Sequence, residues 1–229
     1  MKALVTGTAG FIGSTLTEKL LKEGYEVIGI DCFIDYYSRK LKEKNMESFI
    51  DNNNFTFIEK NILDLDLKEL LKDIDYIFHQ AAQAGVRASW GEDFEIYSDN
   101  NIMGTQKLLE AAKESDIKKF VYASSSSVYG DTDQLPMQEK NRLQPVSPYG
   151  VSKLAAENYI QVFSELYGLE TVSLRYFNVY GPRQGLGSNY SGAITAFITR
   201  LLNGQPPIIY GDGEQSRDFV HVEDVVSAN

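Results

Sequence analysis

Three glycines at intervals of three residues constrain the fold of this chain more than any other feature. Gly7, Gly10 and Gly13 in "GTAGFIG" directly follow the apolar run "ALVT" and open a stretch of helical period. In such a loop the first glycine permits a tight turn, the second lets the backbone approach a pyrophosphate, and the third lets the helix pack on the strand. The helix N-terminus adds free N–H groups and a positive dipole end. The motif therefore predicts a strand, a phosphate-binding turn and a helix.

The rest of the chain repeats the alternation of strand and helix. Short β-branched runs such as "EVIGID", "IDYIFH" and "KKFVYASSS" are separated by longer segments of helical period, among them about 93–115 and about 148–167. This rhythm predicts βαβ units and a parallel sheet with helices on both faces. We therefore expect an α/β fold, a Rossmann-type doubly wound parallel sheet, over residues 1–175.

The texture of the sequence changes after about Arg175. Glycines and prolines separate short elements there, and an amphipathic segment covers residues 193–203. We expect residues 176–229 to form a small substrate-binding lobe against the end of the sheet. This lobe is expected to be truncated, because the last residues, "VEDVVSAN", have the pattern of a helix start without its end.

Composition and charge narrow the possible partners. A net charge of −10 without a lysine or arginine block argues against nucleic acid or an anionic membrane surface as the main partner. The single cysteine, Cys32, excludes an internal disulfide, and with only two histidines the chain is not expected to hold a metal. The N-terminus lacks a secretory pattern, and no apolar run reaches the roughly 18 residues of a membrane span. The expected location is cytoplasmic.

An acidic residue at the end of the second predicted strand indicates which dinucleotide the glycine loop would hold. Asp31 lies 18 positions after Gly13, where a ribose hydroxyl is held in dinucleotide-binding folds. A carboxylate there accepts hydrogen bonds from the ribose diol and repels a 2′-phosphate. NAD is therefore the expected cofactor, although Arg39 and Lys40 slightly weaken the preference over NADP.

The segment "SPYGVSK" supplies a candidate catalytic pair. Pro148 suits the first turn of a helix, so Tyr149 and Lys153, four residues apart, share a helix face. A nearby ammonium favours the phenolate, which makes Tyr149 a plausible general base for an alcohol. The fifth predicted strand ends in "ASSSSVYG", and one hydroxyl among Ser124 to Ser127 is expected to orient the reacting oxygen.

The motifs "TGTAGFIG", "SSSSVYG", "SPYGVSK" and "RYFNVYGPR" together resemble the extended short-chain dehydrogenase/reductase family, and specifically its nucleotide-sugar epimerases. The resemblance runs from Lys2 to the end. It implies a Rossmann-type domain that binds NAD and a smaller lobe that binds a nucleoside diphosphate sugar. It also implies UDP-sugar epimerisation at C4 through a transient 4-keto intermediate.

The resemblance also implies roles for individual residues. Tyr149 matches the base, Lys153 the lysine that also binds the nicotinamide ribose, and Ser125 the catalytic serine or threonine. The expected cofactor-binding residues are Gly7, Gly10, Phe11, Ile12, Gly13, Asp31, Asn61, Ile62, Ala81, Ala82, Gln83, Asn101, Ala123, Tyr149, Lys153 and Tyr176. The expected substrate-binding residues are Ser125, Arg87, Asn178 and Arg217.

The sugar is left open by the resemblance. The stretches "DCFIDYYSRKLKE" and "AAQAGVRASW" most resemble UDP-glucuronate 4-epimerases, whereas Asn178 and "QGLGSNYSGA" depart from them. UDP-glucose, UDP-galactose and their N-acetyl forms therefore remain candidates. Arg87 either meets a sugar carboxylate or caps a helix.

Two rival functions are open at this point. One is a nucleotide-sugar dehydratase or decarboxylase of the same family, although Ser126 and Ser127 stand where dehydratases typically carry an Asp-Glu pair. The other is a non-catalytic NAD-binding sensor or scaffold, because a fold does not fix a function. The predicted helices at about 93–115 and 148–167 are expected to form a homodimer interface, as they do in relatives.

Overall fold

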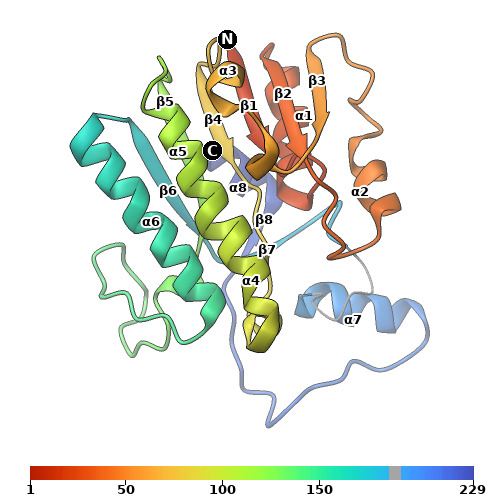
Figure 1. The fold of residues 1–229 in the computed structure, drawn as a ribbon. Coiled ribbons are helices and arrows are strands. Elements are labelled where there is room, and N and C mark those ends of the chain that lie inside the picture. The colour runs from red at the N-terminus through yellow and green to blue at the C-terminus, as the bar shows by residue number, and fades with distance from the viewer. Residues whose placement is uncertain (186–191) are drawn as a thin grey trace.

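A parallel sheet of six strands forms the centre of the molecule, which a computed structural model describes for residues 1–185 and 192–229 (Figure 1). Every pair of neighbouring strands is parallel, and the order is β3-β2-β1-β4-β5-β6. The strands are β1 (Lys2–Thr6), β2 (Glu26–Asp31), β3 (Phe55–Glu59), β4 (Tyr76–His79), β5 (Lys119–Ser125) and β6 (Thr171–Tyr176). The strand order reverses between β1 and β4, and ligands bind at the carboxyl edge of such a switch point.

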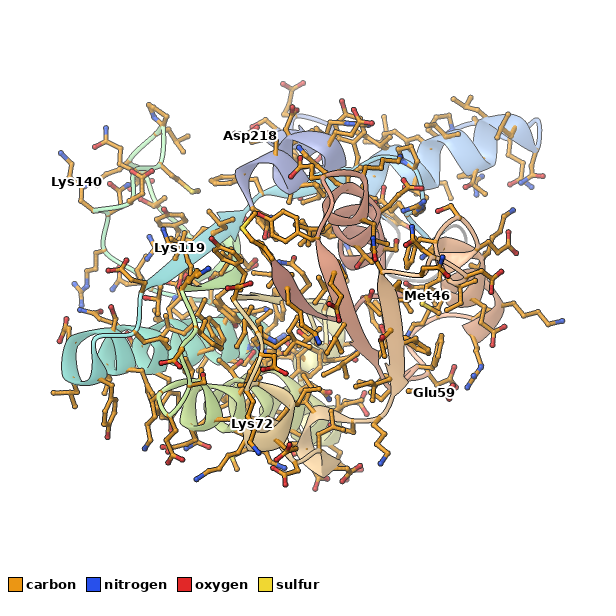
Figure 2. The ribbon with its side chains drawn as sticks, turned by 90° about the horizontal axis from the view of Figure 1, so that it is seen from above. Met46, Glu59, Lys72, Lys119, Lys140 and Asp218 are labelled. Carbon is orange, nitrogen blue, oxygen red and sulfur yellow. The ribbon has the colours of Figure 1, made fainter. Side chains whose placement is uncertain are left out.

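Helices cover both faces of this sheet, as the doubly wound prediction requires, and Figure 2 shows the sheet between them. One face carries α3 (Leu67–Leu70), α5 (Gly104–Ala112) and α6 (Pro148–Tyr167). The other carries α1 (Phe11–Lys22), α2 (Arg39–Met46) and α8 (Val222–Ala228). Alternation along β1 shows why both faces are apolar, because Leu4 joins the first core cluster while Ala3 and Val5 join the second.

Short helical turns lead into the main helices at the carboxyl edge of the sheet. The turns are η1 (Ile62–Asp64), η2 (Arg87–Ser89), η3 (Gly91–Asp93) and η5 (Ser126–Val128). The predicted long helix at about 93–115 consists of α4 (Phe94–Tyr97), a π-helical stretch η4 (Ser98–Met103) and α5. A π-helical turn widens a helix locally and is often found at functional sites.

The C-terminal part contains a small second sheet and two helices. Strands β7 (Asn178–Tyr180) and β8 (Phe219–His221) pair in parallel, and α7 (Ala193–Leu202) lies beyond the carboxyl edge of the main sheet (Figure 1). The chain then returns in α8, whose Val222 and Val226 join the core cluster that includes residues of α1. The division of the chain at residue 175 stays a prediction, and this last helix packs on the first part. Residues 186–191, within the departing stretch "QGLGSNYSGA", lie outside the described residues.

Candidate active site

The glycine turn between β1 and α1 has the shape that the sequence predicts. Gly7 has a φ of +71°, and a Cβ there would lie 2.9 Å from the backbone of Ala81, so only glycine fits. A Cβ on Gly13 would lie 2.0 Å from the carbonyl oxygen of Gly7, which explains the close packing of helix on turn. The N–H groups of Phe11 and Ile12 begin α1, where no preceding helical carbonyl can accept them. The turn therefore presents free N–H donors on a surface without side chains, as a pyrophosphate requires.

A pocket of about 680 Å³, counting the part open to solvent, lies against this turn. Asp31 lines it, and the two oxygens of its carboxylate accept hydrogen bonds from the N–H groups of Ala9 (3.1 Å) and Phe33 (2.8 Å). Asp31 thus ties the glycine turn to the segment after β2. Eight of the predicted cofactor-binding residues line the pocket: Gly7, Gly10, Asp31, Asn61, Ile62, Ala81, Ala82 and Gln83. Glycine turn, carboxylate and apolar walls fit an adenine dinucleotide.

The residues after Asp31 that line this pocket were not predicted from the sequence. The buried Lys42 donates from Nζ to the carbonyl oxygen of Ile34 (2.7 Å) and lies 5.0 Å from the ring centroid of Tyr37. Burial, together with the charge of Asp31, raises the pKa of Tyr37 to about 12. Lys42 and Tyr37 both line the pocket, as does Cys32. These residues belong to the stretch "DCFIDYYSRKLKE", which was used only as evidence for the family resemblance and not to predict pocket residues.

Tyr149, Ser125 and Lys153 come together at the carboxyl end of β5. Ser147 caps α6 by accepting from the N–H of Gly150 (3.1 Å), and this places Tyr149 in the first turn and Lys153 one turn later. Ser125 ends β5 and accepts from the N–H of Ser127 (3.1 Å). Its side chain also forms a hydrogen-bonding interaction with Tyr149 that lowers the pKa of the phenol. The predicted trio is therefore assembled on a strand end and a facing helix.

Burial has a larger effect than charge on the pKa values of Tyr149 and Lys153. The pKa of Tyr149 lies above its ordinary value, chiefly because burial disfavours the phenolate and despite the hydrogen bond to Ser125. Burial also lowers the pKa of Lys153 to about 7, partly offset by the carboxylate of Glu157. The Lys153 ammonium donates to the carbonyl oxygen of Ala123 (2.8 Å). This differs from the expectation that the ammonium makes the phenol acidic, because desolvation acts on both groups.

Two buried residues hold the neighbouring loop in place. The amide of Asn101 exchanges hydrogen bonds with the backbone of Gln83 (2.8 and 3.1 Å) and donates to the Ser152 hydroxyl (2.9 Å). Tyr97 stacks edge-on against Tyr149, with centroids 6.2 Å apart, and is fully buried. Asn101 is thus an anchor for the loop beside the pocket in this structure, and direct contact with the cofactor stays a prediction.

The remaining predicted residues are spread around the carboxyl edge. Ala123 is buried and is linked to Lys153 through its carbonyl, while the Tyr176 hydroxyl accepts from Asn229 (2.7 Å) and donates to Gln80 (3.3 Å). The three arginine and asparagine residues expected to bind substrate, Arg87, Asn178 and Arg217, are exposed. Asn178 donates to the carbonyl oxygen of Asp218 (2.8 Å), and Arg217 to that of Ser216 (2.7 Å). Substrate binding by these three stays a prediction.

Two further properties concern the described ranges 1–185 and 192–229. Within them, no helix combines the length and apolar character needed to cross a bilayer. In the same residues, no three His, Cys, Asp or Glu side chains are grouped as a metal ion would require.

Known proteins resemble this chain over nearly its whole length. An uncharacterised UDP-glucose epimerase of Bacillus subtilis (strain 168) is 48% identical over 227 residues, which cover 99% of this chain and 70% of that protein. The structure of UDP-glucuronic acid 4-epimerase from Bacillus cereus, solved with UDP-glucuronic acid and NAD, is 46% identical with a TM-score of 0.92, over 99% of this chain and 71% of that one.

A second solved structure points in the same direction. UDP-N-acetylglucosamine 4-epimerase from Methanobrevibacter ruminantium M1, in complex with UDP-N-acetylmuramic acid, is 43% identical with a TM-score of 0.91, and the match covers 100% of this chain and 71% of that one. The model of the NAD dependent epimerase/dehydratase family matches residues 3–229. This chain therefore belongs to the NAD-dependent epimerase/dehydratase family.

Proposed function

We propose that this protein interconverts UDP-sugars that differ at C4, with NAD as cofactor and a 4-keto sugar as intermediate. The observation that carries the proposal is the meeting of Tyr149, Ser125 and Lys153 at the carboxyl edge of the sheet that also bears the glycine turn. A base, a hydroxyl donor and a cation at one strand end are the groups that oxidation of an alcohol requires.

The roles of the three side chains follow from their contacts. Tyr149 takes the proton from the sugar 4-hydroxyl and later returns it to the same oxygen. Ser125, which interacts with Tyr149 and has its Oγ fixed by the Ser127 N–H, orients that oxygen. Lys153, while protonated, favours the phenolate that forms as Tyr149 acts as a base. Tyr97 packs on the Tyr149 ring and limits its rotation.

The residues that would hold the cofactor are those of the glycine turn and the pocket beside it. Phe11 and Ile12 offer N–H groups to the pyrophosphate, and Asp31 accepts from the adenine-side ribose. When bound, NAD⁺ supplies a hydride acceptor for C4 and, once reduced, a hydride donor to the opposite face of the keto sugar. Because the cofactor is regenerated within one turnover, retention matters more than exchange.

The sugar is inferred from the relatives. Those reported above are named for UDP-glucose, UDP-glucuronic acid and UDP-N-acetylglucosamine. The uridine diphosphate is common to the three, and we infer that Asn178 and Arg217 hold it here. Arg87 is the candidate partner of a glucuronate carboxylate, because it is an exposed cation close in sequence to the pocket residues Ala82 and Gln83.

A panel of three UDP-sugars tests the proposal. UDP-galactose, UDP-N-acetylglucosamine and UDP-glucuronate are supplied separately with NAD, and products are identified by proton NMR. We expect one or more C4 epimers to appear, and Tyr149→Phe to lower the rate at least about a hundred-fold, as loss of a general base does. Tyr167→Phe, an exposed tyrosine at the end of the same helix, is the control and should leave the rate unchanged.

Other products would identify a rival function. A keto-deoxy sugar or a pentose would indicate a dehydratase or a decarboxylase. No conversion of any of the three sugars, with NAD binding intact, would indicate a non-catalytic sensor or scaffold.

We also infer a homodimer formed by the outer faces of η4, α5 and α6. Val151, Tyr159, Val162 and Leu166 are exposed along one face of α6, and Met103 is exposed on η4. Apolar residues at this spacing form a stripe that suits helix packing. Val162→Glu is expected to give a monomer in sedimentation equilibrium, whereas Glu165→Gln on the same helix should not.

The cytoplasmic location is part of the same proposal and rests on the need for a nucleotide sugar and NAD together.

A further inference from the structure

Three consecutive residues at the end of β5 are linked to three residues of α6. The Ala123 carbonyl accepts from Lys153, Ser125 interacts with Tyr149, and between them the Ser124 hydroxyl donates to the carboxylate of Glu157. The three helix residues are spaced by four, so they lie on one face of α6. The links of Lys153 and Tyr149 position residues that take part in the proposed reaction. The link of Glu157 positions a residue that the proposed reaction does not use.

Glu157 is a buried carboxylate with strong partners. It is 8% exposed, and Arg175 of β6 binds it through Nη2 (2.8 Å to Oε2) and through Nε (3.1 Å to Oε1). The backbone of Arg175 lies beside Ser124 in the register of β5 and β6, so both partners of the carboxylate come from adjacent strands. Arg175 also donates to the Tyr129 hydroxyl (3.1 Å). Glu157 and Arg175 therefore form a largely buried ion pair, unlike the exposed ion pairs of the surface.

The charge of Glu157 acts on Lys153, one helical turn nearer the active site. Burial lowers the pKa of Lys153, and Glu157 is the charged group that opposes this effect. Two other titratable groups face Lys153: Tyr122 of β5, whose ring centroid lies 4.9 Å from Nζ, and His79 of β4. Burial raises the pKa of Tyr122 and lowers that of His79, so both are neutral near pH 7 and add no negative charge. Tyr149, one turn earlier on α6, is neutral for the same reason. Arg175 binds the same carboxylate, and no described hydrogen bond joins it to Lys153.

We propose that Glu157 is a positioning residue of the epimerisation: its carboxylate, fixed by Ser124 and Arg175, is the built-in counter-charge that keeps Lys153 protonated beside Tyr149. The inference rests on the proposed function. Glu157 touches neither sugar nor cofactor in this account, and it acts only through Lys153.

A direct titration of Lys153 tests this without using activity. Protein labelled with carbon-13 at the lysine ε-carbon is titrated by NMR, and the Lys153 signal is assigned from its loss in Lys153→Met. We expect a pKa near the value of about 7 in the parent. In Glu157→Gln, which keeps the shape but removes the charge, the pKa should fall by about one unit, the effect of losing one opposite charge nearby.

The same variant should change catalysis in a specific way. The high-pH limb of kcat is expected to move to lower pH, so that at about pH 8.5 kcat falls roughly ten-fold, because one pKa unit leaves ten-fold less ammonium. KM should change little, since Glu157 does not bind the sugar. Glu165→Gln on the same helix, exposed and bonded only to Gln161 in the described hydrogen bonds, should leave both profiles unchanged.

A second variant covers the case in which Glu157→Gln does not fold because the half-buried Arg175 has lost its ion-pair partner. Replacing both, as Glu157→Gln with Arg175→Met, removes the unpaired cation and should restore the melting temperature. The Lys153 titration and the pH profile should still be displaced toward lower pH. A double variant that regains the parental titration would make Glu157 merely structural and would overturn the inference, as would a folded Glu157→Gln with an unchanged Lys153 pKa.

Failure of the proposed function looks different. If the parent converts no UDP-sugar, the epimerase proposal fails, whereas the NMR titration still reports whether Glu157 sets the charge of Lys153.

Discussion

Two neighbouring side chains of the site have pKa values that are shifted in opposite directions. Tyr149 is harder to ionise than free tyrosine, while Lys153 is easier to deprotonate than free lysine, and burial is the main cause of both shifts. Near neutral pH Lys153 therefore loses its proton more readily than an exposed lysine. The hydrogen bond with Ser125 lowers the pKa of Tyr149, and the carboxylate of Glu157 raises the pKa of Lys153, so each of these two partners opposes the effect of burial.

The carboxylate that closes β2 gives a prediction at the residue scale. Asp31→Asn removes a negative charge that both faces the pocket and ties the glycine turn to Phe33. We expect NAD to bind about ten-fold or more weakly, because hydrogen bonds to a charged group are worth roughly 1.5–3 kcal/mol. Isothermal titration calorimetry measures this, with Asp51→Asn on the exposed turn before β3 as the control. Equal affinity in Asp31→Asn and the parent would contradict the assignment.

Among the secondary-structure elements, α6 carries Tyr149, the proposed base, in its first turn, so the N-terminal cap of α6 links stability to activity. Ser147→Ala removes the acceptor for the Gly150 N–H. Loss of such a cap typically lowers the free energy of unfolding by about 1 kcal/mol. If the first turn of α6 frays, Tyr149 is displaced from Ser125. Urea unfolding should show that loss together with a lower kcat. Ser115→Ala, whose hydroxyl bonds only the carbonyl of Ala112 in the described hydrogen bonds, should alter stability less and kcat not at all.

The elements that sequence reasoning predicted well are those with local signals. The glycine spacing predicted the turn before α1, Pro148 predicted the start of α6, and the β-branched runs predicted the strands. The packing of α8 against α1 and the pairing of β7 with β8 escaped it, because both depend on residues about forty to two hundred positions apart. The Glu157–Arg175 pair was missed although its members are only 18 positions apart, because nothing in "LAAENY" indicates an ion-pair partner in the next strand, β6.

At the scale of the whole molecule, a buried histidine makes stability depend on pH. His79 is fully buried between the hydroxyls of Thr6 (2.7 Å) and Thr105 (3.0 Å), and burial lowers its pKa to about 3. Below the unfolded pKa of about 6.5, unfolding takes up a proton that the folded state refuses, so acid destabilises the fold. This effect is absent above that pH and grows down to about pH 3.

The measurement is urea unfolding at two pH values. Between about pH 7.5 and 5.5, His79 lowers the free energy of unfolding by about 1.4 kcal/mol. This is the effect of one proton that is taken up on unfolding over the one pH unit below the unfolded pKa of about 6.5. His79→Gln, which cannot titrate, should show a smaller change over this interval. Identical pH dependence in His79→Gln would contradict the account.

Residues at one edge of the sheet are proposed to oxidise and then re-reduce the same carbon of a UDP-sugar. This route can be followed with a UDP-sugar that carries deuterium at C4, with the product examined by proton and deuterium NMR. We expect the C4 epimer to retain its deuterium at C4, because the hydride returns to the carbon it left within one turnover. Deuterium at C6, or its loss to solvent water, would contradict the account.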